Sequence, residues 1–266
     1  MNRLFRTLLF YMGLMASTLV LGIVAVGVSY LPGGSDKAHY CGRLWGRINL
    51  WLAGVKVFIQ GIENIDPGRS YIYAANHQGW FDIFAILGKL PVQFRWIAKA
   101  ELFRIPVLGR AMSASGYIPI DRTNRRKAFQ SIDQAALRVR NGTSILIFPE
   151  GTRSPDGIMR DFKSGGFLLA IKSGQPIIPL SISGSYRILP REGTWMIHPG
   201  IIRIGIGEAI PTESVATRDR EELMTRVREA ILRGLTPEEG GTRTEADSTK
   251  REGEFRTTWE GNGRHE

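Results

Sequence analysis

Cysteine is nearly absent from the sequence. Cys41 is the single cysteine among 266 residues, so this sequence cannot close an internal disulfide or supply a multi-cysteine zinc site or an iron–sulfur cluster. The scarcity argues against redox chemistry and thiolate–metal chemistry. With 43% hydrophobic and 23% charged residues, the chain has the composition of a folded protein with a core, which excludes wholesale disorder.

Acidic residues are also in short supply. Lys and Arg number 35 against 25 Asp and Glu, which gives a net charge of +10 and an isoelectric point near 10.0. This balance predicts anionic partners, namely nucleic acid, an acidic membrane surface or phosphorylated small molecules. The charge alone does not choose among them.

Charge is missing altogether from residues 8–31. These 24 residues contain no Asp, Glu, Lys, Arg or His, and as a helix they are long enough to cross a hydrocarbon core of about 30 Å. A cleaved signal peptide is the alternative, because Arg3 and Arg6 resemble its basic start. The apolar region of such a peptide, however, is usually only ~7 to 15 residues long. The sequence therefore predicts a membrane protein.

A second segment, residues 37–60, is amphipathic. Its apolar residues fall on one helical stripe with basic residues on the flanks, and Trp45 and Trp51 are typical interface anchors. Basic residues stand on both sides of the first segment, so two topologies stay open. Either the first helix spans the membrane, or the two helices form a hairpin within one leaflet. We favour the hairpin and expect residues 1–60 to anchor the protein.

Residues 61–235 show the alternation of an α/β domain. The expected fold is a mixed sheet flanked by helices and preceded by the membrane-embedded helical hairpin. Strands are expected at residues 57–62, 71–75, 95–98, 116–120, 144–148, 177–183 and 201–206. Helices are expected at residues 81–89, 125–140, 165–172 and 218–233. The polar residues 236–266 are expected to form a disordered tail.

The strongest chemical signal is N-H-Q-G-W-F-D, residues 76–82, directly after a predicted strand. On one continuous helix a spacing of five residues separates two side chains by about 140°. His77 and Asp82 therefore meet only if His77 lies in a turn and Asp82 in the first helical turn. A carboxylate on one imidazole nitrogen fixes the tautomer and leaves the other nitrogen as a general base. The alternative is a structural pair that caps the helix.

A protein nucleophile to accompany this base is not evident. The sequence has no G-x-S-x-G elbow and no S-x-x-K motif, and Cys41 is far along the chain from His77. His77 is therefore expected to act on a hydroxyl group of the substrate or on water.

A second polar cluster, F-P-E-G-T-R-S, occupies residues 148–154 after another apolar strand. Its proline and glycine predict a turn that presents Glu150 and Arg153 at the carboxyl edge of the sheet, where open α/β sheets bind ligands. Arg153 suits bidentate phosphate binding. The alternative is that both side chains only solvate an exposed turn.

Further cations follow other predicted strands. Arg122 ends the segment G-Y-I-P-I-D-R, although an ion pair with the neighbouring Asp121 is an equal alternative, and Lys99 follows the strand at residues 95–98. Lys163 precedes an apolar helix whose first backbone amides could hold an anion. Cations on separate strand ends predict one pocket that binds an anionic group.

Together these segments resemble the glycerolipid acyltransferase family, and most closely the bacterial 1-acyl-sn-glycerol-3-phosphate acyltransferases. The resemblance covers residues 55–210 and rests on four blocks in order. These are residues 76–82 with H-x4-D, residues 116–122, residues 148–154 with E-G-T-R, and the short proline-containing block at residues 178–180.

The resemblance implies that His77 is the catalytic base and Asp82 its orienting partner. The implied substrate-binding residues are Glu150, Gly151, Thr152 and Arg153, with Arg122 and Lys99 as weaker additions. Two departures from the family pattern bear on positioning and acceptor choice, because Gly79 stands where Ser is common and Pro119 where an aromatic residue is common.

The implied reaction transfers an acyl group from acyl-CoA or acyl carrier protein to the sn-2 hydroxyl of lysophosphatidic acid, giving phosphatidic acid without a metal or bound cofactor. Alternatives are an acyltransferase for another lyso-lipid, such as lyso-ornithine lipid or lysophosphatidylcholine, and a hydrolase. A nucleic-acid binder is disfavoured, because the sequence has no recognisable binding motif and its charge is dispersed. Membrane lipids are the expected partners, at the cytoplasmic face of the bacterial inner membrane.

Overall fold

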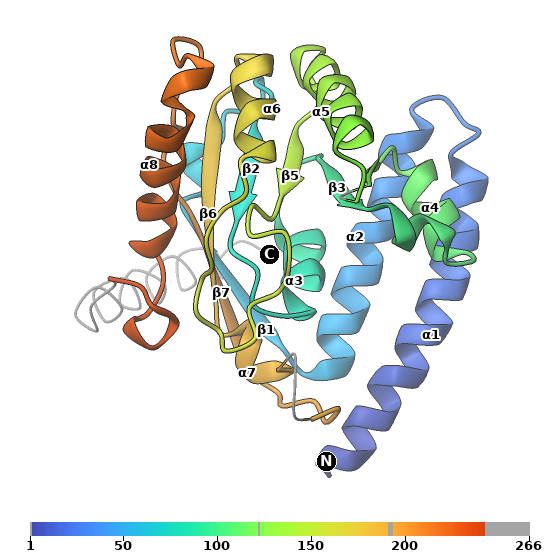
Figure 1. Ribbon diagram of the computed structural model, residues 1–266. Coiled ribbons are helices and arrows are strands. Elements are labelled where there is room, and N and C mark those ends of the chain that lie inside the picture. The colour runs from blue at the N-terminus through green and yellow to red at the C-terminus, as the bar shows by residue number, and fades with distance from the viewer. Residues whose placement is uncertain (1, 122, 191–193, 243–266) are drawn as a thin grey trace, which may run out of the picture.

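Seven strands form one sheet in this computed structural model, which describes residues 2–121, 123–190 and 194–242 (Figure 1). The strand order is β1-β7-β6-β2-β5-β3-β4. The strands are β1 Lys56–Gln60, β2 Ile72–Ala75, β3 Arg95–Lys99, β4 Ile118–Ile120, β5 Ile145–Ile147, β6 Ile177–Ser183 and β7 Ile201–Ile206. The strands from β6 to β4 run parallel, whereas β7 is antiparallel to β6 and β1 is parallel to β7. The expected mixed sheet is confirmed.

Helices cover both faces of this sheet. They are α1 Arg3–Val28, α2 Gly34–Ala53, α3 Phe81–Lys89, α4 Leu108–Ala114, α5 Arg125–Arg140, α6 Gly165–Ser173, α7 Ser185–Ile188 and α8 Arg220–Leu232. Side chains of α1, α2 and α3 share one buried cluster with Tyr73 and Leu146, whereas those of α5, α6 and α8 share another with Ile72 and Ile145. Successive strand residues thus point to opposite faces, and both faces are buried.

Several helix ends follow from local chemistry. The Asn124 side chain accepts a hydrogen bond from the Lys127 amide and caps the start of α5. Helix α3 ends at Lys89 because Leu90 precedes a proline and is extended, with φ −64° and ψ 120°. Gly54 adopts a left-handed conformation, with φ 68°, and ends α2 at Ala53. Helix α2 is therefore shorter than the amphipathic segment expected at residues 37–60, because the last residues of that segment belong to β1.

Helices α1 and α2 form an antiparallel pair on one side of the domain (Figure 1). Polar contacts hold their register, since Trp45 Nε1 donates to Thr18 Oγ1 at 2.9 Å and Asn49 Nδ2 donates to Ser17 Oγ at 3.2 Å. Helix α1 is long and apolar enough to cross a membrane, and only 22% of its most apolar window is buried within the protein. The expected N-terminal helical pair is present.

Both ends of α1 also contact the domain. Near its start, the Ile197 amide donates to Thr7 Oγ1 at 3.1 Å and the Tyr11 hydroxyl donates to the Trp195 carbonyl at 3.0 Å. Near its end, Gly22 lies so close to Val107, just before α4, that a Cβ there would meet Val107 Cγ1 at 2.5 Å. The helix therefore lies along the domain instead of leading away from it.

Two segments depart from the sequence-based expectations. Helix α4 was not expected, and residues 236–242 pack on the domain although the tail was expected to begin at residue 236. A 3-10 turn spans Pro237–Glu239, and the buried Glu239 side chain accepts a hydrogen bond from the Gly184 amide at 2.7 Å. The rest of the expected tail, residues 243–266, lies outside the described residues.

Candidate active site

The site lies where β2, β5 and β3 end. These strands are parallel neighbours, so the segments that follow them meet at one edge of the sheet. The segment after β2 carries His77, the segment after β5 carries Arg153, and β3 ends with Lys99. Lys99 and Arg153, two of the three cations expected to share one pocket, thus lie at neighbouring strand ends.

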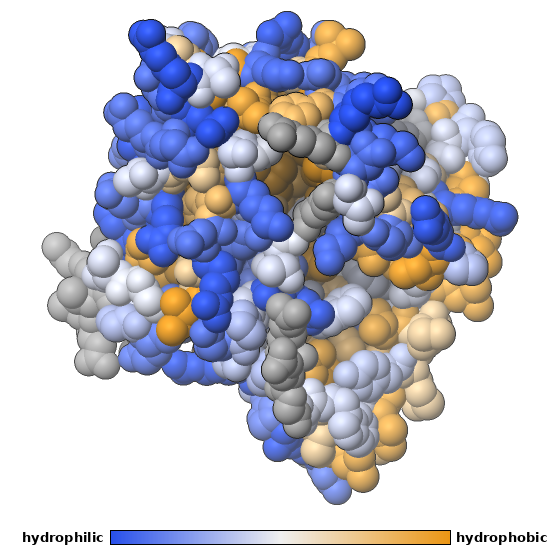
Figure 2. Space-filling view, viewed as in Figure 1, coloured by the Kyte–Doolittle hydropathy of each residue, from blue (hydrophilic) through white to orange (hydrophobic). Residues whose placement is uncertain are grey.

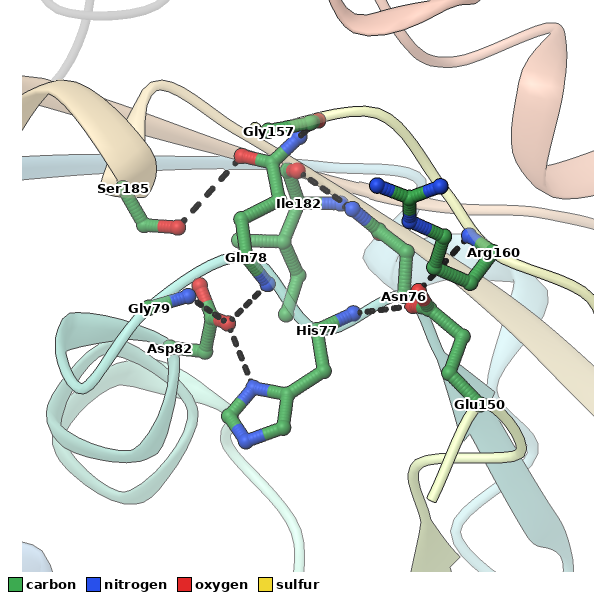
Figure 3. A network of polar contacts seen from close by, with 10 residues as sticks. All are labelled: Asn76, His77, Gln78, Gly79, Asp82, Glu150, Gly157, Arg160, Ile182 and Ser185. Atoms are coloured by element: carbon green, nitrogen blue, oxygen red, sulfur yellow. Dashed lines mark hydrogen bonds and ion pairs between the residues drawn. The ribbon is translucent and has the colours of Figure 1, made fainter. Parts of the chain in front are cut away.

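A short turn between β2 and α3 carries His77. Its first residue, Asn76, is buried, and its side-chain amide pairs with the backbone of Ile182 on β6: Nδ2 donates to the carbonyl at 2.9 Å and Oδ1 accepts from the amide at 2.7 Å. On the other side, Gln78 Nε2 donates to the Gly157 carbonyl at 3.1 Å. The turn is therefore anchored to two separate parts of the chain (Figure 3).

Asp82 sits in the first turn of α3 and faces back into this turn. Its Oδ2 lies 2.7 Å from His77 Nδ1 and accepts the backbone amides of Gln78 at 2.7 Å and Gly79 at 2.9 Å. Asp82 is fully buried, so its carboxylate depends on these donors. The predicted meeting of His77 and Asp82 is confirmed. The same contact gives the imidazole proton to Nδ1 and fixes the tautomer.

Aromatic side chains fix the plane of the His77 ring. Phe148 stacks on the imidazole with centroids 3.9 Å apart and planes 9° apart, and Trp96 in turn stacks on Phe148 with centroids 5.3 Å apart. Within the described part of the chain, no hydrogen-bond partner occupies His77 Nε2, and Figure 3 shows this nitrogen pointing away from the polar network. Nε2 is thus free to accept a proton.

A cavity of about 960 Å³ opens beside His77. It runs from the sheet edge to a space between helices, where its walls are mostly apolar residues of α1, α2, α4 and α5, among them Leu21, Trp45, Met112 and Ile132. Figure 2 shows this face hollowed, with hydrophobic surface inside and largely hydrophilic residues around it. Such a cavity suits a ligand with a long apolar part.

Cations line the same cavity at its polar end. Lys99, Arg153 and Lys163 all contribute to its wall, together with Gly151 and Thr152. The Arg153 guanidinium lies over the Trp80 ring, 5.2 Å from its centroid, a contact that restricts where the charged group can move. Arg122, the remaining expected cation, lies outside the described residues.

Glu150 does not line this cavity, so its expected role as a substrate-binding residue stays a prediction that the cavity wall does not support. Its side chain is 2% exposed, Oε1 accepts the His77 amide at 2.6 Å, and Oε2 accepts the Arg160 amide at 2.8 Å. Burial raises the pKa of its carboxyl from 4.5 to about 7, against the opposing effect of the Arg160 and His77 amides. Both carboxylate oxygens of Glu150 therefore accept hydrogen bonds from the backbone.

Sequence reasoning missed other parts of the site. Phe148 and Trp96 could have been found from strand alternation, because Phe148 falls on the same face as the buried Leu146. The contribution of α1 and α2 to the cavity wall carried no sequence signal. Cys41, which is far from His77 along the chain, lines the same cavity, but burial raises the pKa of its thiol and disfavours the nucleophilic thiolate.

Metal binding has no support in the described ranges, where no group of three or more His, Cys, Asp or Glu side chains could hold an ion. The arrangement is suited to proton transfer by His77 beside a cationic wall. The space between the helices has the apolar walls that suit a ligand with an apolar part.

Comparisons with known proteins agree with these features. The sequence profile of the family described as Acyltransferase matches residues 56–183. The chain is 32% identical to the 1-acyl-sn-glycerol-3-phosphate acyltransferase of Pseudomonas aeruginosa, over 83% of this chain and 86% of the relative. It is 35% identical to a chloroplastic 1-acyl-sn-glycerol-3-phosphate acyltransferase of Brassica napus, over 65% of this chain. It spans only 50% of that relative's length.

A solved structure is similar throughout. The crystal structure of the 1-acyl-sn-glycerophosphate acyltransferase of Thermotoga maritima superposes with a TM-score of 0.76 and 30% sequence identity. The match covers 87% of this chain and 94% of that one, so it includes helices that lie outside the residues matched by the family profile.

Proposed function

This chain belongs to the acyltransferase family that includes the 1-acyl-sn-glycerol-3-phosphate acyltransferases, and from that premise we propose that it acylates the sn-2 hydroxyl of lysophosphatidic acid to give phosphatidic acid. The acyl group comes from a thioester, either acyl-CoA or acyl carrier protein. The observation that carries the proposal is His77, whose Nδ1 is held by Asp82 while its ring lines a cavity that also contains Arg153 and Lys99.

His77 acts as a general base in this proposal. Its Nε2 removes the proton from the substrate hydroxyl as that oxygen attacks the thioester carbonyl. The new carbon–oxygen bond forms, the carbon–sulfur bond breaks, and the imidazolium gives its proton to the departing thiolate, which leaves as the free thiol. Asp82 holds the ring and stabilises its charged form. The step requires no metal or bound cofactor.

The two halves of the cavity match the two halves of the acceptor. A phosphate is drawn to Lys99, Arg153 and Lys163 at the sheet edge, where charge-assisted hydrogen bonds to guanidinium and ammonium groups are strong. The apolar wall between the helices accommodates fatty acyl groups. This division of polar and apolar walls supports a phosphate-bearing lipid as the acceptor.

The protein acts at a membrane in this proposal, with α1 and α2 as a hairpin in one leaflet. Large apolar side chains of α1 face outward, including Met15 at 74% and Ile23 at 59% exposure. The contacts at both ends of α1 with the domain support the hairpin over a spanning helix, because a spanning helix would carry one end away from the domain. The proposed location of the protein is the cytoplasmic face of this membrane.

The test uses detergent-solubilised protein, a labelled long-chain acyl-CoA and a panel of lysophosphatidic acid, lysophosphatidylcholine and lyso-ornithine lipid. We expect lysophosphatidic acid to be the preferred acceptor. Replacement His77→Ala should lower kcat/KM by on the order of 10² to 10⁴ or more, as expected for loss of a general base. His198→Ala is the control, because His198 does not line the cavity.

Preference for another lyso-lipid would contradict the proposed acceptor. Thioester consumption that is equally fast without any lyso-lipid would indicate a hydrolase, and full activity of the His77→Ala variant would contradict the mechanism. Repeating the measurement with acyl carrier protein as donor distinguishes the two thioesters.

A further inference from the structure

Glu150 occupies a position that no substrate-binding role explains. It is buried, it stands outside the cavity wall although its neighbours Pro149 and Gly151 line that wall, and both of its oxygens accept backbone amides. A carboxylate facing the cavity would also repel the phosphate that the cations attract. Figure 3 shows its carboxylate directed at the His77 backbone and at the backbone of Arg160.

These two amides belong to different segments. One lies in the turn that carries the base, and the other lies in the loop between β5 and α6, which also carries Arg153. Two more hydrogen bonds join the same segments: the Ser154 amide donates to the His77 carbonyl at 2.8 Å, and Gln78 Nε2 donates to the Gly157 carbonyl at 3.1 Å. Glu150 contributes the carboxylate of this junction.

We propose that Glu150 is a positioning residue, whose carboxylate clamps the backbone of His77 to the loop that carries Arg153 and so aligns the base with the bound acceptor. The inference rests on the proposed acyl transfer. The clamp acts on the chemical step and leaves acceptor binding to the cations of the cavity.

The expected effect follows from the geometry. A Gln side chain keeps the shape of Glu but presents an NH₂ group to one of the two amide donors, so one hydrogen bond becomes a donor–donor contact. The His77 backbone then shifts, and a misplacement of about 1 Å costs on the order of 10²-fold in rate. We expect Glu150→Gln to lower kcat by about 10- to 100-fold and to leave KM for lysophosphatidic acid within about threefold.

The experiment measures kcat and KM with the full chain in detergent micelles, using a long-chain acyl-CoA and lysophosphatidic acid. Arg153→Ala is the contrasting variant, because it should mainly raise KM. Glu63→Gln is the matched control, because Glu63 is exposed in the 3-10 turn Ile62–Asn64. Thermal unfolding of each variant establishes that the compared proteins are folded.

The pH profile separates positioning from a loss of folded protein. Below pH 7, protonation of Glu150 should lower kcat in the wild type, with Asp82 and Arg160 as the other charged groups near its carboxylate. Glu150→Gln lacks this titration, so its log kcat should depend less steeply on pH in that range than that of the wild type. A smaller amount of folded protein would instead lower kcat equally at every pH.

Other outcomes overturn the inference. A raised KM with unchanged kcat in Glu150→Gln would indicate that Glu150 binds substrate. Kinetics or a pH profile equal to the wild type would show that Glu150 does not position His77. If Glu150→Gln does not fold, Glu150→Asp is measured instead, because the shorter carboxylate reaches only one amide and should also lower kcat. A wild type without transfer to lysophosphatidic acid would contradict the proposed function, whereas an active wild type matched by Glu150→Gln would contradict this inference alone.

Discussion

The Glu150 side chain makes hydrogen bonds that hold the backbone, but its burial disfavours the charged form of the carboxyl. Burial raises the pKa of Glu150 to about 7 in the folded protein, so the folded state holds this proton more tightly than the unfolded state does. The stability that this difference contributes is fully present below pH 4.5, the ordinary value, and is lost as the pH rises through about 7. A difference of this size corresponds to about 3 kcal/mol.

The replacement Glu150→Gln tests this linkage, because an amide does not titrate. Between pH 4.5 and 7.5 we expect the unfolding free energy of the wild type to fall more steeply than that of the variant, measured by denaturant unfolding in detergent. The exposed Glu63→Gln variant should keep the wild-type slope. Parallel pH curves for the wild type and Glu150→Gln would show that Glu150 ionises normally in the folded protein.

At the scale of elements, α2 and α3 approach each other closely at a glycine. A Cβ at Gly46 would lie 2.8 Å from both the Gly88 nitrogen and the Phe84 carbonyl oxygen, and these backbone atoms cannot rotate away. Gly46→Ala should therefore separate the helices and lower the free energy of unfolding by about 1–3 kcal/mol.

The matched control for this prediction is Gly27→Ala in α1, where a Cβ would meet nothing within 4 Å. Alanine is favoured over glycine inside a helix by roughly 0.5–1 kcal/mol, so this variant should be as stable as the wild type or more so. Thermal unfolding of both variants checks the pair. Equal melting temperatures would contradict the close packing of α2 against α3.

The elements also differ in how far the sequence could predict them. Helices α3 and α5 match their expected bounds, because a proline, a capping asparagine and a clear apolar periodicity act locally. Helix α4 was missed because it is short, 7 residues, and because its packing partner, α1, is distant in the sequence. Short helices of this kind depend on tertiary contacts more than on their own residues.

For the whole molecule, the exposed apolar side chains of α1 predict binding to lipid. Met15→Asp removes an apolar contact and adds a charge, so we expect at least about a tenfold loss of affinity for vesicles, since burial of one such side chain is worth about 1.5–3 kcal/mol. Flotation with vesicles of mixed neutral and anionic phospholipid measures the bound fraction.

Leu137→Asp is the control for this experiment. Leu137 is also exposed, at 59%, but it lies on α5, whose side chains pack on the opposite face of the sheet from those of α1. Its replacement should leave vesicle binding unchanged. An equal loss in both variants would mean that lipid binding is not localised to α1.

The sequence by itself determined the features that depend on neighbouring residues. The uncharged run, the strand and helix pattern and the meeting of His77 with Asp82 all follow from short spacings, because backbone periodicity and a five-residue turn bring those groups together without help from distant segments. The expected function came from the resemblance of four short sequence blocks to the acyltransferase family.

Only the tertiary structure decided which way Glu150 faces and which helices enclose the cavity. Glu150 turns inward because its acceptors are satisfied by the amide of His77, 73 residues away along the chain, and by that of Arg160. The cavity places Cys41 of α2 in the same wall as His77. Such contacts follow from how separate elements pack, and packing is set by the shapes of all the surfaces that meet.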